Sequence, residues 1–334
     1  MDSYTTQRPD IGESGRLHAK SVVDHTVEPL TVSGAGLRLQ QHLHALLTLG
    51  LGLAATITGV CAIPWLGFRA LDLTMLIAMY ALTMTGVAVG FHLLFAHRAF
   101  RAGRVVRALL AVAGSMAGQG PVLYWASNHR LHHARSDASG DLHSPWIDAA
   151  GRPSSGIRGF WHAHVGWMFA HDPANHMRLS KDLLRDATLT RINQLYYAWL
   201  VLGLLLPALT GFALEGPRGL WSGLIWGGLA RMCLVQHATF AGNSICHRFG
   251  THTYDTGDRS TNVIWLTIPT WGGAMHNTHH AFPSSAIVGF EWWHLDIAGW
   301  VILLLERIGL AHDVRRPTEQ QIAAARMPQP QAAS

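Results

Sequence analysis

Residues 73–97 of the chain read LTMLIAMYALTMTGVAVGFHLLFAH, an uncharged apolar run that ends in the pair His92 and His97. A helix needs about 20 mostly apolar residues to cross a bilayer, and Leu73 to Phe91 meets this requirement. Neutral imidazole is the commonest side-chain ligand of metals in proteins. The stretch therefore predicts a membrane span that carries potential metal ligands at its end.

Three further segments are long and apolar enough to cross a membrane, although the last of them contains Arg231, Gln236 and His237; they are residues 45–67, 195–214 and 220–240. Short links at 68–72 and 215–219 join the four segments into two helical hairpins. We therefore expect an all-α integral membrane protein with four transmembrane helices, whose long polar segments lie on one side of the membrane.

Basic residues indicate which side this is, because cytoplasmic loops near membrane spans collect Lys and Arg. Each short link has a single arginine, Arg69 or Arg218. The long middle segment has eight basic residues near its two ends: Arg98, Arg101, Arg104, Arg107, Arg178, Lys181, Arg185 and Arg191. The N-terminal segment has no signal-peptide pattern. The sequence thus predicts a multi-pass protein of the cytoplasmic (inner) membrane, with both termini and the middle loop in the cytoplasm.

The remaining segments complete the expected domain organisation. Residues 1–40 and 318–334 are predicted to be flexible, and 41–317 form one membrane domain. The apolar stretch 105–126 is interrupted by Arg107, Gln119, Gly120 and Pro121, so we interpret it as a buried or interfacial helix. Residues 290–310 alternate apolar and charged residues, which predicts an amphipathic helix that lies at the interface and closes a cytoplasmic cap.

Composition excludes several classes of protein. Charged residues make up 13% of the 334 residues and apolar residues 49%, whereas soluble domains average about 25% charged residues. The three cysteines, Cys61, Cys233 and Cys246, form no C-x-x-C pair, which argues against a disulfide framework or a thiolate metal site. The basic residues lack the aromatic interleaving of nucleic-acid-binding segments, so no nucleic-acid partner is expected.

Histidine is unusually common, with 22 residues against 20 acidic ones. Nine of them fall into motifs beside the predicted spans: H-x-x-x-x-H at His92 and His97; H-R-x-H-H at His129, His132 and His133; H-N-x-H-H at His276, His279 and His280; and a single His247. Residues i, i+3 and i+4 share one face of a helix, so each H-x-x-H-H motif can direct its imidazoles to one point. Nine nitrogen ligands suit two ions of Fe, Zn, Cu or Ni. Most of the other histidines need no special role.

The order and spacing of these motifs resemble the integral-membrane fatty-acid desaturases, especially the bacterial branch similar to stearoyl-CoA (delta-9) desaturase. The resemblance runs from about His42 to Pro317 and includes Gly140-Asp-Leu-His-Ser-Pro, Asn243-Ser-Ile-Cys-His and the stretch 255–262. It implies a four-helix membrane stem, a cytoplasmic helical cap and a di-iron centre that uses O2 to remove two hydrogens from an acyl chain. The nine motif histidines would be its ligands, and Asn243 would hold one iron through a water.

Carboxylates usually orient metal-bound imidazoles, and Asp137, Asp141 and Asp258 are candidates because they lie in motif-bearing segments of an acid-poor chain. Each could equally cap a helix or pair with an arginine. Tyr124, Trp125, Trp161 and Trp271, together with Trp167, are candidates for the walls of a substrate tunnel, with core packing as the alternative for each. Their positions beside the histidine motifs motivate the choice.

Two departures from the family pattern leave other reactions open. The chain reads Gly272-Gly273-Ala274-Met275 before the third motif, where the family commonly has Gly-Glu followed by an aromatic residue, and Asn128 stands where an acid is frequent. A related hydroxylase, acetylenase or decarboxylase is therefore an alternative to a desaturase. Histidine richness alone would also fit a membrane metal transporter, but transport needs ligands along a path through the membrane.

The expected partners follow from the resemblance. The acyl substrate would be carried by CoA, acyl carrier protein or a membrane lipid, and the sequence does not distinguish these carriers. The chain has no C-x-x-C pair and no glycine-rich dinucleotide loop. Electrons would then come from a separate ferredoxin or cytochrome-type donor and its reductase.

Overall fold

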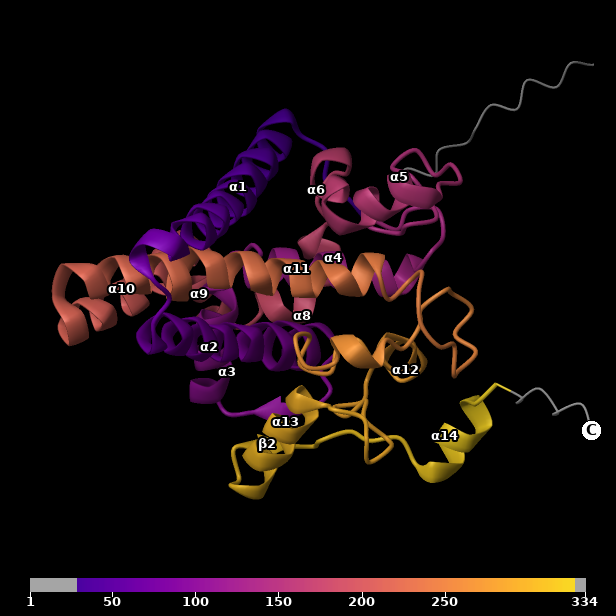
Figure 1. The fold of residues 1–334 in the computed structure, drawn as a ribbon. Coiled ribbons are helices and arrows are strands. Elements are labelled where there is room, and N and C mark those ends of the chain that lie inside the picture. The colour runs from indigo at the N-terminus through magenta and orange to yellow at the C-terminus, as the bar shows by residue number, and fades with distance from the viewer. Residues whose placement is uncertain (1–28, 328–334) are drawn as a thin grey trace, which may run out of the picture.

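The computed structural model describes residues 29–327, so the predictions for 1–28 and 328–334 lie outside the described residues. The described chain is mostly helical (Figure 1). Its only regular strand pair consists of β1 (Arg101–Ala102) and β2 (Ala311–His312), which pair antiparallel. The part of the chain described is therefore mostly helical, as expected, with one short strand pair in addition.

Three continuous helices are long and apolar enough to cross a membrane, as expected for a membrane protein. The first is α1 (Ala35–Leu66), which begins inside the segment predicted to be flexible. The second joins α2 (Ala70–Thr85) to the π-helix η1 (Gly86–Ala96). The third joins α10 (Tyr196–Ser222), η3 (Gly223–Ala230) and α11 (Arg231–Ser244).

The third helix turns back on itself near its middle. Glu215 and Gly216 leave helical geometry, with Gly216 at φ 63°. The arms on either side pack so tightly that a Cβ on Gly211 would lie 2.0 Å from the carbonyl oxygen of Gly219. Figure 1 shows this turn at the left end of α10. The predicted link 215–219 thus coincides with a real reversal of the chain.

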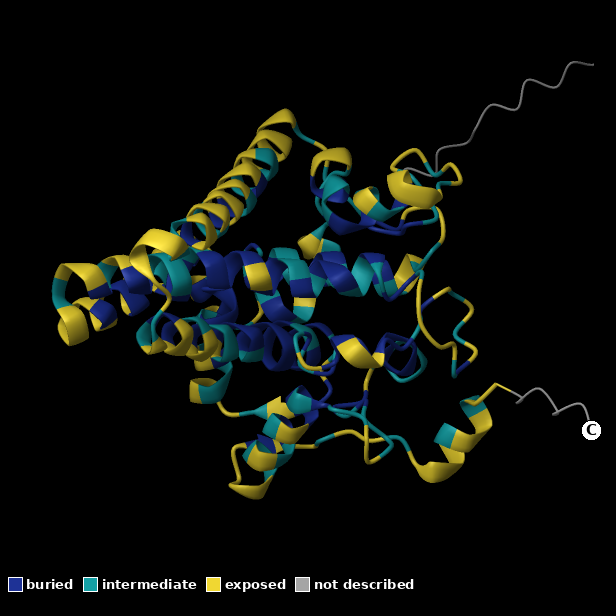
Figure 2. Cartoon of the chain, viewed as in Figure 1, coloured by how far each residue is buried: buried dark blue, intermediate teal, exposed yellow. Residues whose placement is uncertain are grey.

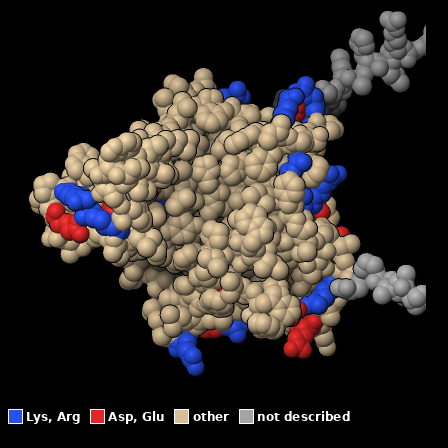
Figure 3. Space-filling model, viewed as in Figure 1, with Lys and Arg blue, Asp and Glu red and all other residues tan. Residues whose placement is uncertain are grey.

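The surface of these helices is apolar. Exposed side chains on α1 include Leu46, Leu53 and Ile57, and those on α10 include Leu205 and Leu209. Figure 2 shows many exposed residues on α1 and on the end of α10, and Figure 3 shows a broad middle region with almost no charged side chains. Such a large apolar surface indicates contact with lipid rather than with water.

Shorter helices lie in the remainder of the described chain. They are α3 (Arg104–Ser115), α4 (Val122–Arg135), α5 (Gly156–Trp161), η2 (His162–Gly166), α6 (Trp167–Ala170), α7 (His176–Leu179), α8 (Lys181–Leu184), α9 (Ala187–Gln194), η4 (Ile264–Leu266), α12 (His276–Ala281), α13 (Ile297–Arg307) and α14 (Glu319–Ala325).

Three of these elements differ from the sequence prediction. The stretch 105–126 forms α3 and α4 rather than one helix, because Gly118 and Gly120 adopt positive φ and Pro121 follows them. In 290–310 only α13 is helical, starting where Asp296 caps the backbone N–H of Gly299. After residue 317 the chain forms α14, which begins with a capping box at Thr318, where a flexible tail was predicted.

Close packing holds η1 against α3, and a buried arginine holds the end of α3. A Cβ on Gly86 would lie 2.1 Å from the backbone nitrogen of Gly114, so η1 approaches α3 at backbone distance. The buried guanidinium of Arg231 donates to the carbonyl oxygens of Gly227, Met116 and Gly203 at 3.1, 2.7 and 2.9 Å. It thereby ties the end of α3 to α10 and to the helix that leads toward His247.

Candidate metal centre

The π-helix η1 explains how the first two histidines can act together. Positions i and i+5 of an α-helix point about 140° apart, which would separate His92 from His97. Here the backbone N–H of His97 donates to the carbonyl of His92 at 3.0 Å, the i to i+5 bond of a π-helix. Wider turns therefore bring the two imidazoles to the same side, with ring centroids 4.9 Å apart.

Two other helices and one loop bring the remaining motif histidines to the same place. α4 supplies the second motif, α12 supplies the third, and His247 follows α11. The nine residues form two groups whose ligand atoms lie within 4.8 Å of one another in each: a five-histidine group of His92, His97, His129, His133 and His279, and a four-histidine group of His132, His247, His276 and His280.

Distances within both groups fit shared ligation of an ion. In the five-histidine group the Nε2 atoms of His92 and His133 lie 2.9 and 3.0 Å from Nε2 of His279. In the four-histidine group Nε2 of His247 lies 3.0 Å from Nε2 of His276. Ligand nitrogens that each lie about 2.1 Å from one ion are roughly 3.0 to 3.4 Å apart. The imidazoles are therefore spaced as ligands around one ion in each group.

The protonation of these imidazoles also favours metal binding. Burial, reinforced by neighbouring imidazoles, holds the pKa well below its usual value in six of them: His97, His129, His133, His276, His279 and His280. These rings are neutral near pH 7 and keep a lone pair for a metal. Buried nitrogens also lack any partner among the described residues, including Nε2 of His132 and of His280.

Three aspartates accept hydrogen bonds from the Nδ1 atoms of three rings of the four-histidine group. Nδ1 of His132 donates to Asp141, with nitrogen–oxygen distances of 3.0 and 3.1 Å. Nδ1 of His247 donates to Asp137 at 2.8 Å, and Nδ1 of His280 donates to Asp258 at 2.6 Å. Because Nδ1 carries the proton in each, the lone pair of Nε2 faces the group. These are the three aspartates selected from the sequence.

The aspartates are themselves fixed by hydrogen bonds. Burial opposes the ionisation of Asp258, yet bonds from Ser260 and Thr256 lower its pKa to about 2. Asp141 also accepts from the backbone N–H groups of Asp137 and His143 at 2.9 and 3.2 Å. The carboxylates therefore stay charged and hold each imidazole in one tautomer and one orientation. The donor set, the spacing and the unpartnered nitrogens all fit two transition-metal ions.

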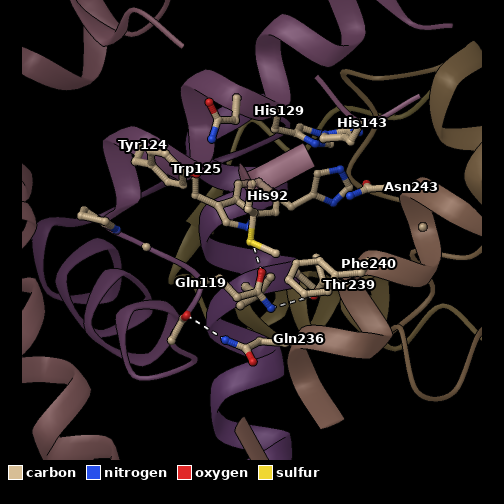
Figure 4. Close-up of a pocket in the computed structure, with 18 of the residues that line it drawn as sticks. His92, Gln119, Tyr124, Trp125, His129, His143, Gln236, Thr239, Phe240 and Asn243 are labelled. Carbon is tan, nitrogen blue, oxygen red and sulfur yellow. Dashed lines mark hydrogen bonds between the residues drawn. The ribbon is translucent and has the colours of Figure 1, made fainter. Parts of the chain in front are cut away.

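A cavity of about 530 Å³ reaches the two groups from the apolar part of the bundle (Figure 4). Its wall includes His92, His129, His276 and His279, and Asn243 lies beside them. Tyr124, Trp125, Trp167 and Trp271 line it as expected. Trp161 does not: α5 turns it outward and its side chain is 52% exposed, so this assignment to the tunnel was wrong.

A hydrogen-bonded set narrows the cavity next to His92. The indole N–H of Trp125 donates to Oε1 of Gln119 at 3.0 Å, and Nε2 of Gln119 donates to Thr239 at 2.8 Å. The Trp125 ring also lies 5.0 Å from the His129 ring in a stacked arrangement. This set locks a flat aromatic wall beside the five-histidine group (Figure 4).

Sequence reasoning missed Gln119, Thr239 and His143 as parts of the site. Gln119 was noted only as an interruption of an apolar stretch, although a polar residue within such a stretch is a functional signal. His143 lies inside the Gly140-Asp-Leu-His run, and its ring lies 4.4 Å from that of His132. It lines the cavity and forms a potential ligand group with His132 and Asp141.

Comparisons with known proteins agree with this geometry. A family model described as "Fatty acid desaturase" matches residues 72–304. The chain is 41% identical over 304 residues to the hex-5-enoyl-[acyl-carrier protein] acetylenase of Moorena producens (strain JHB), covering 90% of this chain and 95% of that one. It is 36% identical over 239 residues to the sn-1 stearoyl-lipid 9-desaturase of Anabaena variabilis, covering 71% and 80%. It is 35% identical over 248 residues to the icosanoyl-CoA 5-desaturase of Limnanthes douglasii, covering 72% and 64%.

Proposed function

The chain belongs to the fatty acid desaturase family, and on that basis we propose that it is an oxygen-dependent acyl desaturase with a histidine-ligated di-iron centre. The observation that carries the proposal is that histidines of both groups line one largely apolar cavity. An alkyl chain in that cavity would lie beside two ions whose ligands are all imidazoles.

The substrate explains why such a centre is needed. The C–H bonds of an alkyl chain have no acidic proton and no leaving group, so side-chain acid or base chemistry cannot break them. Two iron ions held by the histidines would supply the oxidising chemistry, in which O2 is reduced to two waters while two hydrogens leave adjacent carbons. The balance requires two electrons and two protons from outside, which a separate ferredoxin or cytochrome-type donor and its reductase would supply.

The residues of the chain then have distinct tasks. The nine histidines would hold the ions, and Asn243, which lines the same cavity as His276, would hold one ion through a water. Asp137, Asp141 and Asp258 keep three of the imidazoles oriented. Trp125, fixed by Gln119, would press on the acyl chain beside His92 and so decide which carbons reach the ions. The apolar walls exclude water from the reacting carbons.

We also propose the arrangement of the protein in the membrane. The turn at Glu215 and Gly216 divides the third apolar helix into two crossings, which makes four with α1 and the α2–η1 helix. The positive-inside rule then places the histidine groups, the cap and both termini in the cytoplasm. The membrane domain would span about residues 41–317, in the cytoplasmic (inner) membrane.

A second candidate reaction is the formation of a triple bond. The relative from Moorena producens, which this chain matches over 90% of its length, is named an acetylenase for an enoyl chain on acyl carrier protein. An acetylenase removes two hydrogens from a carbon–carbon double bond and can use the same centre. Other relatives are named for a lipid-bound and a CoA-bound acyl chain. The test must therefore identify both the carrier of the acyl chain and the position of the oxidised carbons, which we propose is delta-9-like.

The test is expression in a host that lacks the activity, with the double and triple bonds of its fatty acids located by mass spectrometry. We expect new unsaturated chains and about two irons per purified chain. Replacing His132 or His279 by Ala should abolish the products, whereas His312→Ala, on β2, should not. Full activity without iron would refute the proposal, and triple bonds would select the acetylenase. Metal uptake by vesicles without acyl oxidation would instead support the transporter.

A further inference from the structure

Trp146 links the protein surface directly to the four-histidine group. Its indole N–H donates to the backbone carbonyl oxygen of His247 at 2.7 Å. The side chain is only partly buried, so one end of the ring contacts a metal-binding residue while another reaches solvent. Trp146 lies in the loop after Asp141, and no part of the proposed acyl chemistry uses it.

Two guanidinium groups stack on this ring. The Arg259 guanidinium carbon lies 4.3 Å from the ring centroid, and that of Arg248 lies 5.0 Å away. The backbone N–H of Arg259 also donates to Asp137 at 2.9 Å, the carboxylate that accepts from Nδ1 of His247. Two routes of hydrogen bonds therefore connect the protein surface with His247. One runs through the indole of Trp146 and the other through Asp137.

The surface around Trp146 is basic. Arg248 donates to the carbonyl of Gly156 at 2.9 Å, which places it beside the start of α5, the helix that carries Arg158, with Arg152 in the loop before it. These two arginines share one carboxylate, Asp148, whereas neither Arg248 nor Arg259 forms a salt bridge within residues 29–327. Phe249, 57% exposed, adds an apolar contact next to Arg248. Unneutralised arginines around one exposed and one partly buried aromatic ring are suited to docking an acidic protein.

We propose that the surface formed by Arg248, Arg259, Phe249 and Trp146 is the docking site of an acidic one-electron carrier protein, and that Trp146 leads its electron to the metal centre through His247. This inference rests on the proposed function. In each encounter the reduced carrier loses one electron and an ion held by His247 gains one. No covalent bond changes and no proton moves at the indole, and two encounters supply the two electrons that one acyl oxidation needs.

The test uses the iron-loaded full chain in nanodiscs of neutral phosphatidylcholine, with a plant-type [2Fe–2S] ferredoxin as the acidic probe. Binding of the oxidised ferredoxin gives Kd at several salt concentrations. Anaerobic mixing with the reduced ferredoxin gives the rate of electron transfer, and dithionite gives the rate of reduction without docking. The variants are Arg248→Gln with Arg259→Gln, Trp146→Leu and Trp146→Phe, with Arg191→Gln on α9 as the control.

The double arginine variant should raise Kd at least tenfold and flatten its dependence on salt, while Arg191→Gln leaves both unchanged. Trp146→Leu should keep Kd within about twofold but slow transfer from ferredoxin at least tenfold, with the dithionite rate unchanged. Trp146→Phe, which keeps a ring and loses the N–H, should fall between. These outcomes separate docking from electron transfer.

The inference is overturned if the double arginine variant binds ferredoxin like the wild type, or if Trp146→Leu accepts electrons at the wild-type rate. It is also overturned if the arginine changes affect only binding to anionic phosphatidylserine vesicles, since the surface would then face the membrane. Should ferredoxin reduce the wild-type centre while no acyl product forms, the proposed function fails and the docking site stands.

Discussion

The carboxylate of Asp141 lies 3.0 and 3.1 Å from Nδ1 of His132, and both side chains are completely buried. A charged acceptor at this position fixes the tautomer that leaves Nε2 of His132 free of protons. It also makes the imidazole a stronger donor to a metal. The four-histidine group therefore depends on a residue that need not touch the ion.

Replacing Asp141 by Asn should weaken metal binding without removing a ligand. The amide keeps one acceptor oxygen but loses the charge, and such changes typically lower metal affinity by about 10- to 100-fold. Iron content after dialysis against a graded chelator measures the effect. Asp313→Asn is the matched control, because Asp313 pairs with Arg101 on the surface. Equal iron retention by the two variants would contradict the role given to Asp141.

Trp125→Phe should change which carbons are oxidised. The change keeps an aromatic wall beside His92 but removes the N–H that bonds Gln119. A lost hydrogen bond of about 1 kcal/mol corresponds to an approximately fivefold change in the equilibrium between the bonded ring position and other positions. We expect several positional isomers where the wild type makes one, as measured by mass spectrometry of the products. Trp199→Phe, which loses only a bond to the carbonyl of Ile192, should leave the product unchanged.

Gly86→Ala should destabilise the protein by about 1–3 kcal/mol, the usual range for overpacking. The new Cβ would lie 2.1 Å from a backbone atom of α3, which cannot move aside as a side chain could. The midpoint of heat-induced aggregation in detergent, followed by size-exclusion chromatography, reports the loss. Gly50→Ala provides the comparison, because nothing lies within 4 Å of its added Cβ. Similar midpoints for both variants would refute the close contact of η1 with α3.

Removing the metal should make stability depend steeply on pH. Burial lowers the pKa of buried imidazoles such as His133 and His276 in the folded chain, while the unfolded chain titrates near about 6.5. Below that pH the unfolded state binds more protons, so the unfolding free energy falls as the pH falls. Chelator-treated protein should therefore lose thermal stability between about pH 7 and pH 5. Iron-loaded protein should change less over the same range, and parallel curves for the two forms would contradict the assignment of these rings as ligands.

Much of the site could be read from the sequence because its signals are local. The H-x-x-H-H motifs and the three aspartates of an acid-poor chain were visible in the sequence, but the prediction that each motif directs its rings to one point was wrong. His129 and His133 join one group and His132 the other, and the third motif likewise sends His279 to the first group and His276 and His280 to the second. Trp161 was misplaced because nearness in sequence does not say which way a side chain points. Gln119 and Thr239 were missed because their partnership joins residues 120 positions apart. The break between α3 and α4 was also missed, because Gly120 and Pro121 were interpreted as interruptions of one helix, whereas the positive φ of Gly118 and Gly120 ends it.

The π-helix at Gly86–Ala96 gives this protein an unusual sensitivity to changes in length. Deleting one residue between His92 and His97 would let the helix relax to an ordinary α-helix. Every side chain before the deletion would then rotate by about 100° relative to those after it. The two histidines would then be four residues apart and would still share one face of the α-helix, but their position relative to the other seven histidines and to the cavity wall would change. The spacing of His92 and His97 is therefore tied to the wide turns of this helix, and a change in its length would displace the pair from the other ligands.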